Sequence, residues 1–309
     1  MTRVVLAAYI VMILVWGTTW AAIKIGVETV PPFVFALERA IAVAGVLTLV
    51  ALALRLPFPR DRKTLAAAAV AGVFNTGLSW ALIFWAEQFV ASGLVAVFGA
   101  TAPVWTAFLA HFLVRGDRLS WLKIAALGFG LAGTAVLVAG PVTRDGAVQG
   151  SDVVAATVLL ALMPITWAIA AILASRYLQQ ASPIPVIAIE VWAGGLVLVP
   201  FALSQAALPS VWTAPAIISF AYLVLLGSCV GLVLNLWLYR KLRPTTVSLA
   251  QVLIPVQAVL IGALALGEEV TVRTLVGALL VFAAVGLNAR AGSGPPQERD
   301  ERGSVAAAD

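Results

Sequence analysis

The sequence is poor in charge, cysteine and histidine, and each shortage argues against a class of protein. Only 11% of its 309 residues are charged and 62% are hydrophobic, with a mean hydropathy of +1.05. Soluble domains carry about 25% charged residues, so a soluble enzyme or nucleic-acid-binding protein does not fit. The one cysteine, Cys229, can form no intrachain disulfide, and the one histidine, His111, has no Cys or carboxylate cluster beside it. We therefore expect neither a metal nor a cofactor.

Ten apolar runs fill almost the whole chain, and each is long enough to cross a bilayer, which takes about 20 apolar residues. Only a few residues separate most of them. The pattern predicts an all-α integral membrane protein with ten transmembrane helices in a lipid bilayer. The runs are approximately Val4–Gly26, Pro32–Leu54, Thr64–Phe84, Ala91–Val114, Leu119–Ala139, Val153–Leu178, Ile184–Leu203, Ala216–Tyr239, Thr246–Leu266 and Thr271–Leu287.

Lysine and arginine are distributed unevenly between the two sets of loops. With the N-terminus in the cytoplasm, thirteen of them fall on the inner side, against three (Lys24, Arg144 and Arg273) on the outer side. Positive residues collect in cytoplasmic loops. We therefore expect a cell-membrane protein with both termini in the cytoplasm. This bias also accounts for the net charge of +5 without a nucleic-acid partner.

The chain repeats itself. Thr-Trp-Ala at 19–21 recurs at 166–168, and Pro-Val at 103–104 recurs at 255–256. Five spans per copy is an odd number, so the two copies must be inverted in the membrane, an arrangement that secondary transporters often use. The last residues are rich in Gly, Pro and mixed charges, which predicts disorder. We therefore divide the chain into a first five-helix repeat (1–145), a second, inverted five-helix repeat (146–290) and a disordered cytoplasmic tail (291–309).

Three stretches carry a family resemblance: WGTTWAAIKIG with the following PPFVFALERA, AEQFVASGLVAVFGATAPVWTAFLA, and YRKLRPTTVSLAQVLIPVQAVLIGALALGEEV. They resemble EamA-type transporters of the drug/metabolite transporter superfamily, over about residues 5–290. The first repeat departs slightly from the family pattern, because its turn reads Arg-Gly-Asp where the turn of the second repeat reads Leu-Gly-Glu. The resemblance implies ten helices, a central cavity between two bundles, and commonly the export of small metabolites or amino acids.

Uncharged polar and aromatic residues in mid-span are the candidate substrate-binding residues. Polar groups in hydrocarbon would lack hydrogen bonds, so they must face protein or water. Interhelical hydrogen bonds, or core packing for the tryptophans, would explain them equally well. These candidates are Trp16, Trp20, Asn75, Ser79, Trp167, Asn235 and Gln251.

Ionisable groups and prolines inside the spans are the candidates for coupling or gating. A charge at the bilayer centre is costly, so such groups are functional candidates by default. Arg39 matches an arginine of the family in this span, and either an interhelical anchor or a substrate contact fits it. Glu38 and Glu190 fit either proton carriers or paired structural carboxylates. Pro103 and Pro255 occupy matching repeat positions and invite kinks that would let their spans move.

Three further features have plain structural explanations. Lys24 is expected to snorkel toward the outer surface beside Glu28, and Glu87 to be a solvated interfacial acid. Ala126, Gly130 and Gly133 form a small-residue stripe that fits a scaffold contact or a homodimer contact.

The function that fits best is secondary transport, the export of small metabolites, amino acids or drugs by alternating access. A multi-pass membrane enzyme is the alternative, but it would usually show clustered His or Asp motifs. A channel is another, but it would want a filter sequence or a ring of charges. No phosphate-binding glycine loop is present, so ATP does not drive transport directly. Proton coupling, exchange and facilitated diffusion all remain open.

The charge bias makes a topology prediction. With Cys229 replaced by serine, a single cysteine in the Arg144 loop should react with an impermeant thiol reagent added to intact cells. A single cysteine in the Arg60 loop should react only after the cells are opened. Labelling of the Arg60 loop in intact cells would overturn the orientation.

Overall fold

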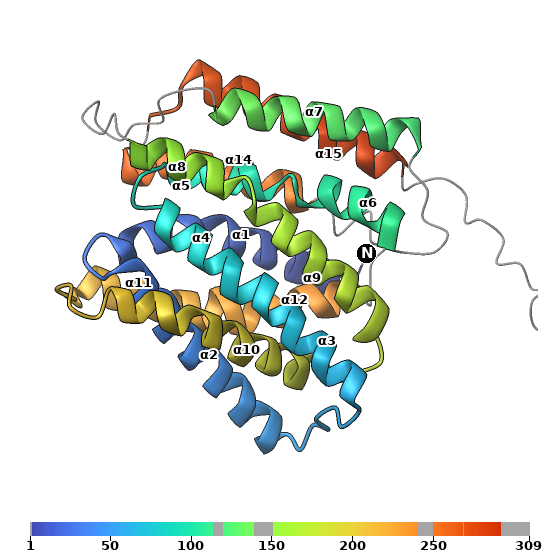
Figure 1. The fold of residues 1–309 in the computed structure, drawn as a ribbon, viewed down its shortest axis with the longest axis vertical. Helices are drawn as coiled ribbons and strands as arrows, with labels where there is room; N and C mark the ends of the chain where they lie inside the picture. The colour runs from blue at the N-terminus through green and yellow to red at the C-terminus, as the bar shows by residue number, and fades with distance from the viewer. Residues whose placement is uncertain (1, 114–119, 139–150, 240–249, 268, 292–309) are drawn as a thin grey trace, which may run out of the picture.

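The protein is described by a computed structural model that covers residues 2–113, 120–138, 151–239, 250–267 and 269–291 (Figure 1). Every regular element among these residues is a helix. The predicted boundary between the repeats and all but the first residue of the predicted tail lie outside the described residues. The elements are α1 (Arg3–Val27), α2 (Pro32–Ala53), α3 (Arg62–Gly72), η1 (Val73–Leu78), α4 (Ser79–Ala86), α5 (Ser92–Gly99), α6 (Ala102–Leu113), α7 (Trp121–Val138), α8 (Ser151–Leu160), α9 (Met163–Tyr177), α10 (Pro183–Ser204), α11 (Ala214–Tyr222), η2 (Leu223–Val230), α12 (Gly231–Tyr239), α14 (Ala250–Leu266) and α15 (Val272–Ala291).

Eight helices of the described chain are long and apolar enough to cross a membrane. They are α1, α2, α10, α15 and four composite helices: α3–η1–α4, α5–α6, α8–α9 and α11–η2–α12. Two further apolar helices, within α7 and α14, are shorter. The prediction of an all-helical membrane protein is therefore confirmed, whereas the count of ten spans stays a prediction.

Proline explains where two of the composite helices break. Pro103 and Pro164 are each the second residue of a new helix, and α5 and α8 end four residues before them, at Gly99 and Leu160. A proline ring clashes with the carbonyl group four residues earlier and offers no N–H to it. Pro255, in contrast, lies inside a continuous α14.

The other two composite helices contain π-helical segments. η1 joins α3 to α4, and η2 joins α11 to α12, without interrupting either span. A π-helical turn has more residues than an α-helical turn, so it rotates the following side chains relative to the preceding ones and often marks a functional site.

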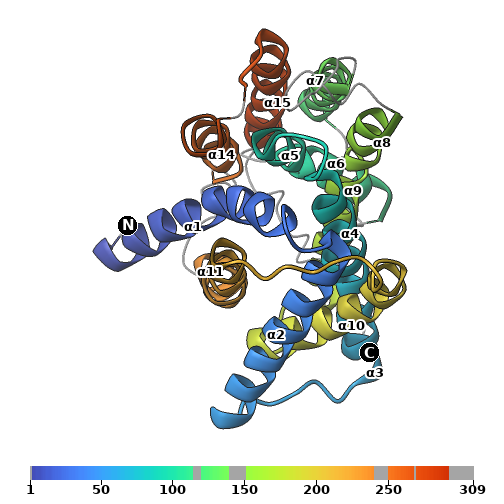
Figure 2. The same cartoon turned by 90° about the vertical axis from the view of Figure 1, so that its left-hand side faces the viewer.

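The helices form a flattened bundle with paired helices at both sides. α7 lies along α15 at one side, and α2 lies along α10 at the other (Figures 1 and 2). Between these pairs, α5 packs against α14, α6 against α9, and α1 against α11, α12 and α14. Gly133 of the predicted small-residue stripe lies against α15, where an added Cβ would be 2.9 Å from the Gly277 carbonyl oxygen. The stripe therefore makes a contact within the chain.

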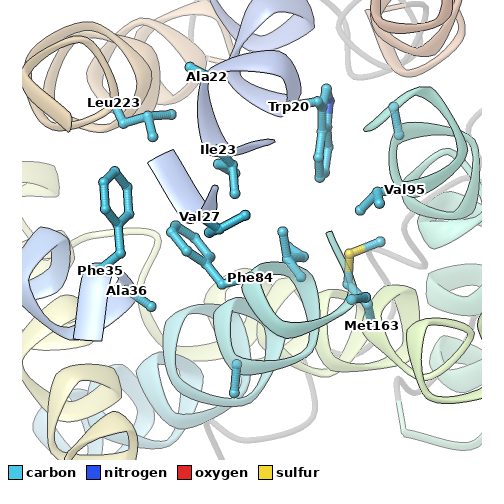
Figure 3. Packing of buried hydrophobic residues seen from close by; sticks show 14 of the residues in the cluster. Trp20, Ala22, Ile23, Val27, Phe35, Ala36, Phe84, Val95, Met163 and Leu223 are labelled. Carbon is cyan, nitrogen blue, oxygen red and sulfur yellow. The ribbon is translucent and has the colours of Figure 1, made fainter. Parts of the chain in front are cut away.

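The main apolar core gathers aromatic side chains around the C-terminal end of α1. Phe35 is fully buried and stacks on Trp212, with ring centroids 5.5 Å apart. Its ring also lies 5.8 Å from that of Phe84, which Figure 3 shows beside Val27. This end of the bundle is consequently filled with side chains.

Two glycines bring the backbones of α10 and the α3–η1 helix into contact. A Cβ at Gly194 would lie 2.6 Å from the Gly72 carbonyl oxygen and 2.5 Å from the Thr76 Cβ. A Cβ at Gly72 would collide with the backbone of Glu190. Small residues at such crossings allow membrane helices to approach closely, and this crossing fixes where Glu190 stands.

Gly72 should therefore tolerate no side chain. Gly72→Ala should destabilise the protein by about 1–3 kcal/mol, the usual cost of overpacking. Gly45 in α2 is the matched control, because nothing lies within 4 Å of an added Cβ there. Gly45→Ala should be neutral or stabilising by up to about 1 kcal/mol, since alanine is the better helix former. Thermal unfolding in detergent measures both variants, and equal effects would contradict the close approach.

Candidate functional site

A cavity of about 630 Å³ occupies the middle of the bundle. It is lined by α1, α2, the α3–η1–α4 helix, α5, α6, α9, α10, η2, α12 and α14, with single contributions from α7 and α15. The lining residue from α7 is Lys123, in the first turn of that helix, which follows α6 in the chain. The cavity therefore reaches toward the end of the bundle where α6 ends and α7 begins. Its volume lies within the 300–1,000 Å³ that is usual for small-molecule sites.

Tryptophans form much of the cavity wall. Trp20 and Trp167 face each other with ring centroids 6.3 Å apart, and both line the cavity. The Trp16 indole Nε1 donates a 3.1 Å hydrogen bond to the Gly227 carbonyl oxygen of η2. That hydrogen bond ties α1 to η2 and holds the Trp16 ring at the wall.

Arg39 is the most deeply buried charge of the wall, with 6% of its surface exposed. Its Nη2 donates a 3.0 Å hydrogen bond to the Ser228 Oγ of η2. Its guanidinium carbon lies 4.2 Å from the centre of the Trp80 ring and 5.7 Å from that of Phe84. Cation–π contacts of this kind hold a guanidinium without neutralising it.

Asn75, Glu190 and Asn235 supply further polar groups of the wall. Asn75 belongs to η1 and lies beside the Glu190 carboxyl group on α10. Asn235 lies on α12, two turns beyond Ser228. The cavity wall therefore carries hydrogen-bond donors and acceptors from both halves of the chain.

The two predicted prolines also reach the cavity. Pro103 lines it at the start of α6 and Pro255 from within α14. The carbonyl oxygen of Pro103 accepts a 3.1 Å hydrogen bond from the Asn288 side chain of α15. This hydrogen bond joins the broken α5–α6 helix to the last helix.

Three predicted residues are placed elsewhere. Ser79 is fully buried and donates its hydroxyl hydrogen to the carbonyl oxygen of Asn75, one turn earlier. Glu38 is exposed and does not line the cavity, because its neighbour Arg39 takes the inward direction. Gln251 lies in α14, but its side chain is outside the described residues.

The structure corrects the interpretation of Lys24 and Glu87. Lys24 does not snorkel: 2% of it is exposed, and Glu87 is fully buried rather than solvated. The Lys24 ammonium group donates to the carbonyl oxygens of Glu87 and, at 2.7 Å, Val90. Carbonyl groups at a helix C-terminus have no partner within the helix and carry partial negative charge. The end of α4 therefore provides a binding site for the ammonium group inside the protein.

Sequence reasoning missed several wall residues, among them Thr76, Trp80, Asn288 and Lys123. Trp80 was not singled out because it lies near the end of its predicted span, where tryptophan is common at the membrane surface. Asn288 sits among apolar residues near the end of the last predicted span, and its polarity is a signal that could have found it. Within the described chain, no group of three or more His, Cys, Asp or Glu side chains could hold a metal.

Comparison with known proteins gives consistent matches over most of the chain. The model of the EamA-like transporter family matches twice, at residues 3–139 and 154–290. The "Uncharacterized inner membrane transporter YedA" of Escherichia coli K12 is 32% identical, over 90% of this chain and 88% of the relative. The "Probable terminal-alkyne amino-acid exporter" of Streptantibioticus cattleyicolor is 28% identical, over 90% and 91%. A crystal structure that is 19% identical has the same fold, with a TM-score of 0.60 over 95% of this chain and all of the other.

The cavity should be accessible to water, unlike the outer surface of α7. In a chain without Cys229, Asn235→Cys and Ala107→Cys should react with a water-soluble maleimide, because both positions line the cavity. Leu131→Cys is the control: Leu131 is exposed on α7, where a thiol in lipid would not ionise and would stay unreactive. Rapid modification of Leu131→Cys with no reaction at Asn235→Cys would contradict the assignment of the cavity.

Proposed function

The chain belongs to the EamA-like transporter family, and on that premise we propose that it exports a small organic solute from the cytoplasm by alternating access. One observation carries the proposal: a cavity of about 630 Å³, lined by residues from both family matches, is surrounded by membrane-spanning helices. The family and the transporter names of its relatives favour transport over a membrane enzyme. The cavity wall, with single polar groups from many helices, fits solute binding better than an ion-conducting ring of charges.

The architecture that we propose is ten transmembrane helices in two inverted five-helix repeats, residues 1–145 and 146–290. The two family matches support it, and so do the equal lengths of α2 and α10, which both span 22 residues and begin at a proline. In this register Glu190 corresponds to Arg39 rather than to Glu38, since each is the eighth residue of its helix. The pairs α7–α15, α2–α10 and α5–α14 are those that a twofold axis between the repeats would place side by side.

The distribution of packing supports alternating access. Around Lys24 the bundle is closed by an aromatic cluster of the buried Phe35 and Phe84 and the half-buried Trp212. At the other end the cavity extends along α6 as far as Lys123. Opening the closed end requires the Lys24 ammonium group to leave the end of α4, and the helix break before Pro103 supplies a joint for that movement. Pro255 faces the same cavity from α14 and is the second joint that we propose.

Charge supports the orientation that we propose, and a relative's name supports the direction of transport. The excess of Lys and Arg supports an orientation with the Lys123 end in the cytoplasm, and in that orientation the cavity would face inward. The name of the Streptantibioticus relative, an exporter, agrees with release to the outside. Glu190, a carboxylate on the cavity wall, is the proton carrier to test first if transport proves to be coupled to protons.

A metabolite-release screen with cells that overexpress the protein would test this function. At least one solute should accumulate outside these cells, and purified protein in proteoliposomes should transport it, with and without a pH gradient to reveal coupling. Asn235→Ala should raise the half-saturation concentration about 5- to 150-fold, because a lost hydrogen bond at a buried polar site costs about 1–3 kcal/mol. Leu131→Ala on the outer surface of α7 should leave it unchanged. No transport of any solute by correctly inserted protein would refute the proposal.

A further inference from the structure

We propose that the cavity binds the carboxylate group of its solute at Arg39, so that the transported class is organic anions with an apolar body about the size of an aromatic ring. The inference rests on the proposed transport function and names its substrate class. It depends on three independent features of the wall: the surroundings of Arg39, two donors without partners, and the sum of the buried charges.

The surroundings of Arg39 fix the guanidinium without satisfying it. Its one side-chain hydrogen bond in the described structure goes to the neutral hydroxyl of Ser228, and its faces lie near Trp80 and Phe84. A guanidinium has five N–H donors in a planar fork that matches a carboxylate with two parallel hydrogen bonds. Most of these donors therefore remain for a ligand.

Two wall donors have no hydrogen-bond partner among the described residues: Arg39 Nε and Trp20 Nε1. Both atoms are buried, and both residues line the same cavity, from α2 and α1. A buried donor without a partner costs about 1–3 kcal/mol, so a site built this way favours a ligand that brings acceptors. A carboxylate brings two oxygen atoms and no competing donor.

The buried charges also favour an anion. Lys24, Arg39 and Glu87 are the charged residues of the described chain that are buried, and together they carry one excess positive charge. Glu87 acts electrostatically on Arg39, but it lies at the end of α4, where the Lys24 ammonium group binds its carbonyl oxygen. On the cavity wall itself, the half-buried Glu190 carboxylate offsets one of the two positive charges of Arg39 and Lys123, so one positive charge is again in excess. A bound carboxylate would balance it.

The aromatic wall determines the rest of the solute. Trp16, Trp20 and Trp167 line the same cavity as Arg39 and offer large apolar faces to a ring. Aromatic rings gain about 0.5–1.5 kcal/mol from such contacts beyond the area that they bury. An aryl or indolyl carboxylate therefore uses both parts of the site.

Three probes of matched shape separate charge from shape: indole-3-acetate, the neutral indole-3-acetamide and the cationic tryptamine. Calorimetric titration of purified protein in detergent should show that indole-3-acetate binds at least 10-fold more tightly than either of the others. Equal binding of the acetate and the amide, or tightest binding of tryptamine, would overturn the inference.

Variants then assign the preference to Arg39. Arg39→Gln should weaken indole-3-acetate binding about 10- to 150-fold, the range for a hydrogen bond to a charged group. The affinity for indole-3-acetamide should stay within about threefold of the wild-type value. Arg39→Lys should recover only part of the affinity, because lysine keeps the charge but not the planar fork. Leu131→Ala, an exposed position, should bind both probes as tightly as the wild type does.

If Arg39→Gln does not fold, Trp20→Phe keeps a six-membered aromatic ring but removes the unpartnered donor together with the five-membered ring of the indole. Both probes lose the same apolar contact, so binding of the acetate should weaken about 2- to 10-fold more than binding of the amide; equal losses for both probes would count against the inference. Binding in detergent requires no transport, so the two proposals fail separately. Transport without a carboxylate preference would refute the substrate class alone, whereas an Arg39-dependent preference without movement of any solute would refute the transport function.

Discussion

The structure depends on one constraint: two positive charges, Lys24 and Arg39, are buried in the bundle, where the described chain has one buried carboxylate, Glu87, to offset them. Each charge is accommodated differently. Lys24 uses backbone carbonyl groups at the end of α4, which fixes α1 against the span beside it. Arg39 uses a hydroxyl of η2 and the face of Trp80, which fixes α2 between η2 and α4. The closed end of the bundle and the central cavity are organised around these two side chains.

The lengths of the apolar runs predicted the helices well, because a bilayer requires long apolar segments whatever the tertiary packing. α1 and α2 begin and end within one residue of the predicted runs. Five of the seven predicted binding residues, Trp16, Trp20, Asn75, Trp167 and Asn235, line the cavity, because polar and broad aromatic groups at mid-depth turn away from lipid. Their roles in binding remain predictions.

Side-chain directions were less predictable, for local and long-range reasons. η1 changes the helical phase just before Ser79, and that hydroxyl bonds to its own backbone instead of facing the cavity. Lys24 finds its acceptors 63 and 66 residues further along the chain, where no pattern of side chains marks a backbone carbonyl. Glu38 and Arg39 are adjacent, and only the packing of α2 decides which of them points inward.

The sequence distance between partners has a consequence for biogenesis. Lys24 meets the Glu87 carbonyl after 63 further residues, entirely within the first family match, whereas Arg39 and Ser228 are 189 residues apart. At roughly 5–20 residues per second of synthesis, Arg39 waits about 10–40 s for this partner. During that interval the nascent chain holds an arginine charge among its first inserted helices. Trp80 and Phe84 can contact this charge from within the first family match, but its hydroxyl partner comes only with the second half, so the proposed solute site is among the last parts of the protein to be completed.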